Sequence, residues 1–333
     1  MRNQVVLAVA MLVTVSLLTT SATSHIPIVP DDGTTLATAT EIIDPWKSWF
    51  YYSELGSEEA HYYKFDASAG ERIRFMLNIP IPEGDRGFTP VFILMGPGIT
   101  DSGTPDPSIE IPSGAGVMVI ESDTLEPEYE GFTPMSQYTA VDLNMSVPET
   151  GTYYIAVYSD TTGGRYALVT GYVEAYTIVG WIAVPLDVMI LLQWSGQNLF
   201  FILIPMFLPL ILGLIFLFSR QRALFGKENI HTLLGTLGGL MFLGSALSFS
   251  TQVVYALTQA PANWTIIPSL IFISLPLILG IATLRILRGE NWETRSNSLI
   301  LIVLSVMAPF VWAGLYIGPV FVIASGLITI FKK

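Results

Sequence analysis

Three uncharged apolar runs constrain this chain more than any other feature of its sequence. They are Leu199–Phe218, Leu233–Leu257 and Ile266–Leu284, with 20, 25 and 19 residues. A helix of about 20 apolar residues crosses the ~30 Å hydrocarbon core of a bilayer. With 51% hydrophobic and 13% charged residues, the chain is predicted to be an integral membrane protein. This composition excludes a disordered polar protein, an ordinary soluble enzyme and a nucleic-acid binder.

The charged residues divide the chain into an acidic part and a basic part. Residues 25–197 hold 24 acidic and 6 basic side chains, a sum of −18, whereas residues 198–333 hold 3 and 8, a sum of +5. The division predicts two parts in different surroundings, with a boundary near residue 197. The chain has no cysteine, which excludes disulfides, a thiolate nucleophile and thiolate metal ligands.

Residues 1–24 have the pattern of a secretory signal peptide. Arg2 precedes the 14-residue apolar run Val5–Leu18, and small polar residues follow. This run is too short to span a bilayer, and Ala22-Thr23-Ser24 fits the small-x-small cleavage pattern. We expect cleavage before His25, with an uncleaved anchor as the alternative.

Residues 25–173 are predicted to form an all-β sandwich or jelly roll outside the membrane. Short runs rich in Tyr, Phe, Val and Ile alternate with turn residues, as in antiparallel sheets. In one run Ile73, Phe75 and Leu77 would face the core, and Arg72 and Arg74 would face water. Seven strands are predicted: Tyr62–Phe65, Arg72–Ile79, Val91–Met95, Val117–Glu121, Thr139–Asn144, Thr152–Tyr158 and Tyr166–Tyr172.

Two hairpin motifs stand at the beginning and the end of this region. Residues 60–73 read AHYYKFDASAGERI, and residues 147–155 and 163–168 read VPETGTYYI and GGRYAL. These motifs resemble the opening and closing hairpins of bacterial pre-peptidase C-terminal domains, over residues 35–172. The resemblance implies a β-sandwich accessory domain that is not itself catalytic. At His61 the chain departs from the family, which often has an acidic residue there, so the resemblance alone carries over no calcium site.

The positions of the basic residues predict the orientation of residues 198–333, the helical transmembrane domain. Residues 219–227 and 285–295 each carry three positive charges and the chain ends with two lysines, whereas residues 258–265 carry none. Basic loops are cytoplasmic, so the β-sandwich is expected on the outer side of the plasma membrane. Leu299–Phe331 is too long for one span. A hairpin turning at Gly314–Pro319 would give five spans and a cytoplasmic C-terminus, with four spans as the alternative.

Residues 174–197 are apolar but are predicted not to cross the membrane. They contain Pro185 and Asp187, are flanked by Trp181 and Trp194, and counting them as a span would invert the charge distribution. We expect an interfacial helix that seats the sandwich on the membrane.

The second apolar run carries small residues that permit close helix packing. They include Gly235, Gly239, Gly244 and Ser248. Packing within the chain is favoured over a homo-oligomer or a membrane protein partner. The spans hold no ionisable residue before Arg285, which argues against a transporter.

Several residues of the acidic part are candidates for a ligand or metal site. Glu126, Glu128 and Glu130 could supply oxygen ligands for calcium, although a solvated acidic loop is favoured. An N-terminal His25 with His61 could hold copper, a minor alternative. An aromatic group that could stack on sugars, but more readily packs in the sandwich or on lipid headgroups, comprises Trp46, Trp49, Phe50, Tyr51 and Tyr52.

Two tripeptides match the acceptor pattern for N-glycosylation. They begin at Asn144 and Asn263, and both fall on the predicted outer face. Asn263 lies next to a predicted span, where modification is disfavoured.

The sequence therefore predicts a non-enzymatic membrane protein without a cofactor. Its acidic sandwich would bind an extracellular ligand, glycan or protein. The alternative is an accessory subunit of a membrane enzyme or transport complex, docking through the glycine-rich second run. A copper enzyme is the more distant third hypothesis.

Overall fold

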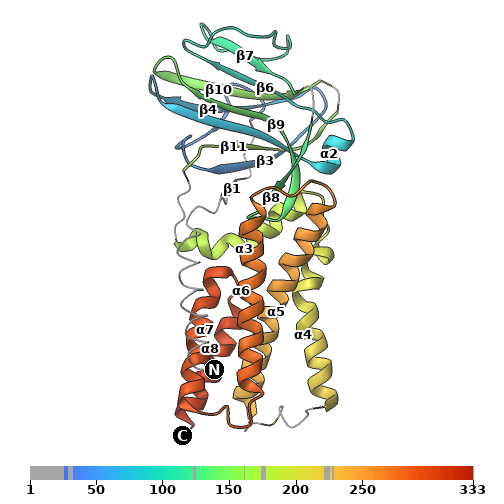
Figure 1. Cartoon of the computed structure of the whole chain (residues 1–333). Coiled ribbons are helices and arrows are strands. Elements are labelled where there is room, and N and C mark those ends of the chain that lie inside the picture. Colours follow the sequence, from blue (N-terminus) through green and yellow to red (C-terminus); the bar gives the residue numbers. More distant parts are fainter. Residues whose placement is uncertain are drawn as a thin grey trace.

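The computed structural model describes residues 26–28, 33–122, 125–160, 162–173, 178–220, 226 and 229–332. The predicted signal peptide, residues 1–24, lies outside these residues, as does His25. A β-rich N-terminal part sits on a helical C-terminal part (Figure 1).

Two sheets form the N-terminal part. One has six strands in the order β1-β3-β11-β5-β9-β8 and the other has five in the order β2-β4-β10-β6-β7. Only β1–β3 and β2–β4 pair in parallel among the named strands. The strands are β1 (Ile26–Ile28), β2 (Thr40–Glu41), β3 (Trp49–Leu55), β4 (Glu59–Ala67), β5 (Arg72–Pro80), β6 (Val91–Gly96), β7 (Gly116–Ile120), β8 (Pro127–Glu130), β9 (Met135–Ser146), β10 (Gly151–Ser159) and β11 (Gly164–Thr170), with the short helix α2 (Ile81–Asp85) after β5.

The two sheets enclose one apolar core, so the predicted β-sandwich is present. All seven predicted strands occur, and β1, β2, β3 and β8 are additional. The alternation predicted for β5 is confirmed, because Ile73, Phe75 and Leu77 are at most 1% exposed, whereas Arg72 is exposed and Arg74 half-buried. Side chains of successive strand residues point to opposite faces, which places these three in the core.

The helix α3 (Ile178–Trp194) lies between the sandwich and the other helices, and runs roughly parallel to the sheets (Figure 1). Its Leu191, Leu192 and Trp194 pack against Phe50 and Tyr52 on the outer face of the six-stranded sheet. This face is therefore covered, and the five-stranded sheet is the one that points away from the helices.

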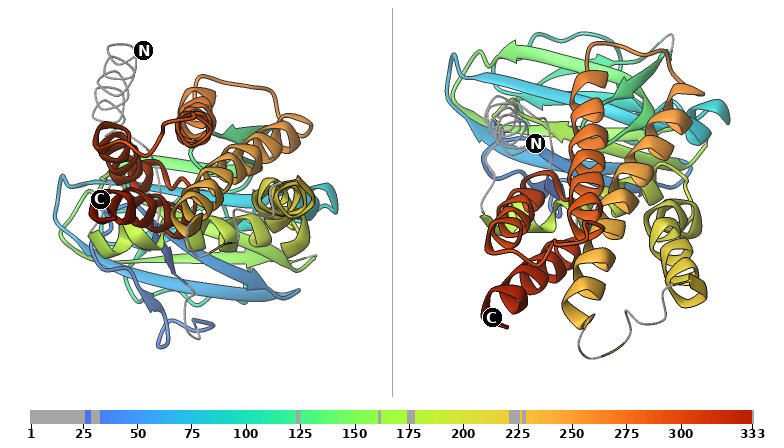
Figure 2. Two further views of the ribbon diagram at one scale, coloured as in Figure 1. Left: turned by 90° about the horizontal axis from the view of Figure 1, so that it is seen from below. Right: turned by 60° about the horizontal axis from the view of Figure 1, so that its bottom comes forward.

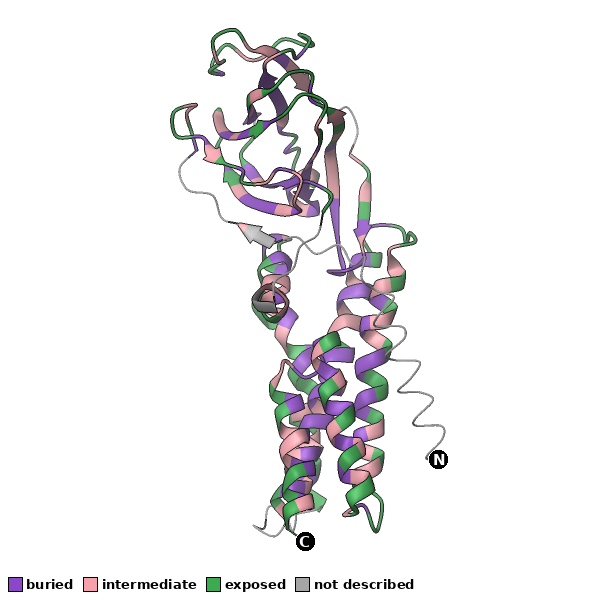
Figure 3. Ribbon diagram, turned by 90° about the vertical axis from the view of Figure 1, so that its left-hand side faces the viewer, coloured by how far each residue is buried: buried purple, intermediate pink, exposed green. Residues whose placement is uncertain are grey.

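Among the residues that the structure describes, three helices of the C-terminal part are long and apolar enough to cross a membrane. They are α4 (Leu199–Arg220), α5 (Ile230–Leu257) and α6 (Ile266–Leu287), and they match the three predicted runs. The view from below shows α5 in the middle, with α4 on one side and the last two helices on the other (Figure 2). Figure 3 shows buried and exposed residues side by side along the helical part, and the exposed side chains of α4, α5 and α6 include Phe200, Val254 and Ile267.

The last two helices, α7 (Arg295–Met307) and α8 (Ile317–Phe331), form a hairpin. With 13 and 15 residues they are about 20 Å long, shorter than α4 to α6. The turn lies earlier than Gly314–Pro319, beginning with the 3-10 helix η3 (Ala308–Val311) and ending at Tyr316. Pro319 lies in the first turn of α8, where its missing N–H costs no helical hydrogen bond.

The β8–β9 hairpin joins the two parts of the protein. Its tip enters the end of the helices nearest the sandwich, where Phe132 contacts Phe272 of α6 at 5.5 Å between ring centroids. Tyr129 and Ser269 hydroxyls lie 2.7 Å apart, and Ser136 donates to the Ala256 carbonyl at 2.8 Å. A side chain at Gly131 would place its Cβ 1.6 Å from the Thr265 carbonyl oxygen, so only glycine fits this contact.

Candidate functional site

A groove of about 410 Å³ lies on the sandwich, where the chain passes from β2 of the five-stranded sheet to β3 of the six-stranded sheet. Parallel pairing of β2 with β4 places Glu41 beside Lys64, and antiparallel pairing places Thr152 of β10 beside Asp66. The polar and aromatic residues that line it are Glu41, Asp44, Trp46, Lys64, Phe65, Asp66, Thr152 and Tyr154, of which Phe65 is buried in the core.

The groove is acidic. Three carboxylates against one lysine give it a formal charge of −2. Asp66 is exposed and accepts a hydrogen bond from the Thr152 hydroxyl at 2.6 Å. Asp44 pairs with Lys47, and Glu41 is exposed. Glu41 and Asp66 are thus the exposed carboxylates that can accept hydrogen bonds from a cationic group, while Asp44 is already paired.

Trp46 is the member of the predicted aromatic group that reaches this groove. Backbone hydrogen bonds hold its loop in place, because the N–H groups of Tyr172 and Val173 donate to the Trp46 carbonyl at 3.0 Å. The other four pack elsewhere. Tyr51 lies in the core with Trp49 partly buried against it, whereas Phe50 and Tyr52 pack on α3.

The predicted acidic loop is part of the β8–β9 hairpin. Glu128 accepts a hydrogen bond from Thr139 at 3.0 Å, and Glu130 accepts one from the Phe132 N–H at 2.9 Å. Burial raises the pKa of Glu130 to about 7. The hydrogen bonds from two backbone N–H groups lower this pKa but do not offset the effect of burial. Among the described residues no three His, Asp or Glu side chains gather closely enough to hold a metal ion.

His61 belongs to a hydrogen-bonded network at the edge of the core. Its Nδ1 lies 3.0 Å from Ser53 Oγ and 2.9 Å from the Tyr166 hydroxyl, which lies 2.8 Å from the Tyr63 hydroxyl. Burial raises the pKa of both tyrosines, so their hydroxyls remain neutral. The network links strands of both sheets, and the copper hypothesis depends on His25, which lies outside the described residues.

The two glycosylation candidates lie in different settings. Asn144 is exposed on β9 and accepts a hydrogen bond from Arg72 Nε at 2.8 Å. Asn263, in the loop between α5 and α6, donates from Nδ2 to the Tyr129 carbonyl at 3.0 Å. That nitrogen, the atom that glycosylation would modify, helps to hold the β8–β9 hairpin.

The small residues of α5 contact helices of the same chain. A Cβ at Gly235 would meet Ser325 of α8, one at Gly239 would meet Leu284 of α6, and one at Gly244 would meet the Met206 carbonyl of α4. These glycines therefore let three neighbouring helices approach α5.

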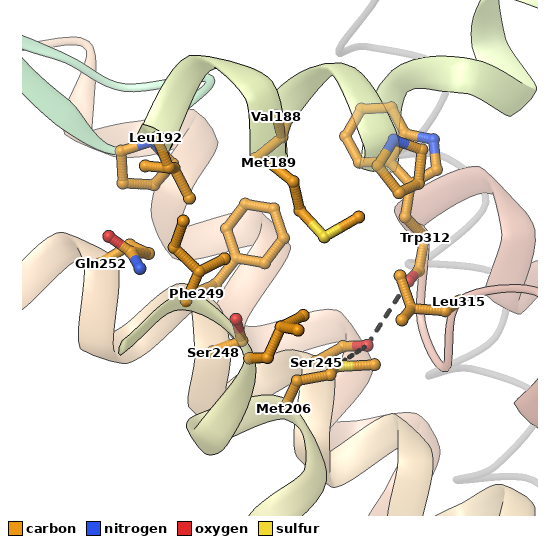
Figure 4. A pocket seen from close by; sticks show the side chains of 14 residues that line it. Val188, Met189, Leu192, Met206, Ser245, Ser248, Phe249, Gln252, Trp312 and Leu315 are labelled. Atoms are coloured by element: carbon orange, nitrogen blue, oxygen red, sulfur yellow. Dashed lines mark hydrogen bonds between the residues drawn. The ribbon is translucent and has the colours of Figure 1, made fainter. Parts of the chain in front are cut away.

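Ser248 instead lines a narrow cavity of about 80 Å³ beneath α3. Figure 4 shows Gln252 and Leu192 at one side of it, Trp312 and Leu315 at the other, and Met189 pointing in from α3. Gln252 is 3% exposed, and neither atom of its amide has a hydrogen-bond partner among the described residues. The cavity thus combines apolar walls with one unsatisfied amide.

Comparisons with known proteins add little to this description. No family model and no curated protein sequence matches the chain. Among solved structures, the chain is similar to PliG, a periplasmic inhibitor of g-type lysozyme from Salmonella Typhimurium, with 16% identity over 45% of this chain and 98% of that one. The TM-score is 0.22, too low for an argument about function.

Sequence reasoning missed the groove because its residues are far apart in the chain. Glu41 and Tyr154 are separated by more than 100 positions and meet only through the pairing of β2 with β4 and of β4 with β10. The composition, an acidic region with several tryptophans, could have indicated a site that binds cations, but not which residues form it.

Proposed function

We propose that this protein is a non-enzymatic membrane protein whose extracytoplasmic sandwich binds a cationic segment of another protein in the groove of Glu41, Asp66 and Trp46. The observation that carries the proposal is the meeting of three carboxylates with Trp46 and Tyr154 in one concavity. Carboxylates pair with Lys or Arg, and an indole face attracts the same cations.

The charge of the whole sandwich supports this choice of partner. The −18 carried by residues 25–197 attracts a cationic protein over a longer range than the groove itself. Complementary charge of this kind raises the association rate and fixes orientation. A neutral glycan would gain nothing from it.

The proposed orientation is supported by the basic residues of the helical part. The described cations of this part lie at helix ends away from the sandwich: Arg220, Arg285, Arg288, Arg295 and Lys332 (Figure 1). Basic residues mark the cytoplasmic side, so the sandwich would lie outside the cell. The hairpin of α7 and α8 would return the C-terminus to the cytoplasm, giving five spans of which two are short.

A direct test uses the full-length protein in nanodiscs and a fluorescent hexa-arginine peptide. Binding is measured by anisotropy for the wild type and for the triple variant Glu41→Gln, Asp44→Asn, Asp66→Asn. We expect the triple variant to bind at least about tenfold more weakly, since each lost charge-assisted contact costs about 1 kcal/mol or more.

The matched control removes three carboxylates elsewhere on the sandwich, by Glu54→Gln, Glu58→Gln and Glu149→Gln, all exposed and outside the groove. It is expected to weaken binding by less than about threefold, through the general field alone. Equal losses in the two variants would contradict the groove and leave only non-specific attraction. Trp46→Ala, which changes no charge, should also weaken binding.

A further inference from the structure

A second groove, of about 820 Å³, opens on the helical part at the end away from the sandwich. Its floor is α5 and its walls are α4 and α6. Along α4 it extends from Pro209 to Arg220, about 16 Å at 1.5 Å per residue. This is close to half of the ~30 Å hydrocarbon thickness, the depth of one leaflet.

The walls change character along this length. Towards the middle of the bundle they are apolar, formed by Leu212, Phe216, Leu240 and Leu284. At the far end the groove is bounded by Arg220, the last residue of α4, and Arg288, the residue that follows α6. The groove is thus apolar where acyl chains lie in a membrane and cationic where headgroups lie.

Two further features favour an anion at the cationic end. Thr232 lines the groove in the first turn of α5, so the N-terminus of that helix lies at this end of the groove. A helix N-terminus carries a partial positive charge and unpaired N–H groups. Among the described residues neither Arg220 nor Arg288 pairs with a carboxylate, and Glu293 of the nearby loop is bonded to His231 at 2.8 Å.

We infer that this groove binds one anionic glycerophospholipid of the leaflet on the side of Arg220 and Arg288. The two guanidinium groups would hold the phosphate, each able to donate two parallel hydrogen bonds. An acyl chain would lie along α5 between α4 and α6, where it covers apolar surface that the chain itself leaves open. The lipid would also fix α4, the least buried of the three long helices, to the rest of the bundle.

Native mass spectrometry tests the inference. The full chain is released from micelles that contain equal amounts of phosphatidylglycerol and phosphatidylcholine. The wild type is expected to retain one phosphatidylglycerol in preference to phosphatidylcholine. The double variant Arg220→Gln, Arg288→Gln should lose this preference by about tenfold or more, because each cation near the headgroup attracts the anionic lipid.

The matched control is Arg285→Gln with Arg295→Gln, which removes the same charge at the same end but outside the groove. It should retain phosphatidylglycerol as the wild type does. Thr236→Trp keeps both arginines and fills the apolar part, and should also lose the lipid. Circular dichroism of each variant checks that the helices are intact.

Three outcomes would overturn the inference. Equal retention by the wild type and the groove variants would show that the groove is not the site. Equal loss in the control would show a general charge effect. Retention of the lipid by Thr236→Trp alone would show that the headgroup is recognised and the apolar part of the groove is not used.

Discussion

The ring of Phe132, from the sandwich, stands edge-on to the ring of Trp312, from the turn between η3 and α8, with centroids 5.4 Å apart and planes at 88°. Phe132 is 2% exposed and lies in the core of the helical part. Trp312 in turn donates from Nε1 to the Trp181 carbonyl of α3 at 3.2 Å. One aromatic side chain of the β8–β9 hairpin therefore connects the sandwich, α3 and the α7–α8 hairpin.

Phe132→Ala is expected to destabilise this junction. Removing a buried phenylalanine costs about 3–5 kcal/mol through lost burial and the cavity that remains. Thermal unfolding of the purified protein should therefore begin at a lower temperature, with hydrogen exchange rising first in the β8–β9 hairpin. Phe310→Ala is the control, because Phe310 is 54% exposed and should change little. Equal effects of the two substitutions would show that the hairpin contact contributes no stability.

Glu83 holds a second contact between the sandwich and α3. It is buried and pairs with Arg165 Nη2 at 2.7 Å, while Arg165 Nη1 donates to the Gln193 carbonyl of α3 at 3.3 Å. Glu83→Gln leaves Arg165 without its countercharge, and we expect a loss of about 3 kcal/mol in the free energy of unfolding. The more exposed pair of half-buried Arg74 with Asp142 is the comparison, since Asp142→Asn should cost less than about 1 kcal/mol. Urea unfolding measures both, and similar costs would contradict this account.

Glu130 is expected to make stability depend on pH. Burial raises its pKa to about 7 from the ordinary value of 4.5. Between these values the folded protein binds the proton and the unfolded chain does not, so stability falls as pH rises from about 4.5 to 7. Thermal unfolding at several pH values should show this slope in the wild type and a smaller one in Glu130→Gln. Identical slopes would show that Glu130 is not desolvated.

Gln252 is expected to reduce stability in the wild type. Its buried amide has no partner among the described residues, and such a group costs about 1–3 kcal/mol. Gln252→Met keeps the length of the side chain and removes the polar atoms, so the midpoint of thermal unfolding should rise. Gln259→Met, which removes a side chain that donates to the Tyr255 hydroxyl, should give no such rise. A lower midpoint for Gln252→Met would show that the amide is satisfied by a bound molecule.

The elements whose residues are close in sequence could be predicted from the sequence. The spans follow from uninterrupted apolar runs, and the face of β5 follows from alternation at Ile73, Phe75 and Leu77. Both patterns depend on local geometry alone. The same reasoning found seven strands of the sandwich, missed β1, β2, β3 and β8, and did not fix which strands are neighbours.

The contacts between distant parts could not be predicted in this way. The segment around Glu126, Glu128 and Glu130 has the composition of a solvated loop, yet Tyr129 and Phe132 insert into the helices. Composition counts the charged and the aromatic residues of this segment together, although they point to opposite faces of the hairpin. The groove between α4, α5 and α6 exists because α4 and α6 lie on either side of α5. The residue pattern of a single helix does not reveal this arrangement.

The side of the membrane on which the sandwich lies can be tested most directly with single cysteines. The chain has no cysteine, so each introduced cysteine is the one residue that a maleimide labels. Ser113→Cys lies on an exposed turn of the sandwich, and Glu290→Cys on the exposed loop between α6 and α7. A membrane-impermeant maleimide is added to intact cells and then to permeabilised cells. Ser113→Cys is expected to be labelled in intact cells, and Glu290→Cys only after permeabilisation. The opposite pattern would place the acidic groove in the cytoplasm and contradict the proposed function.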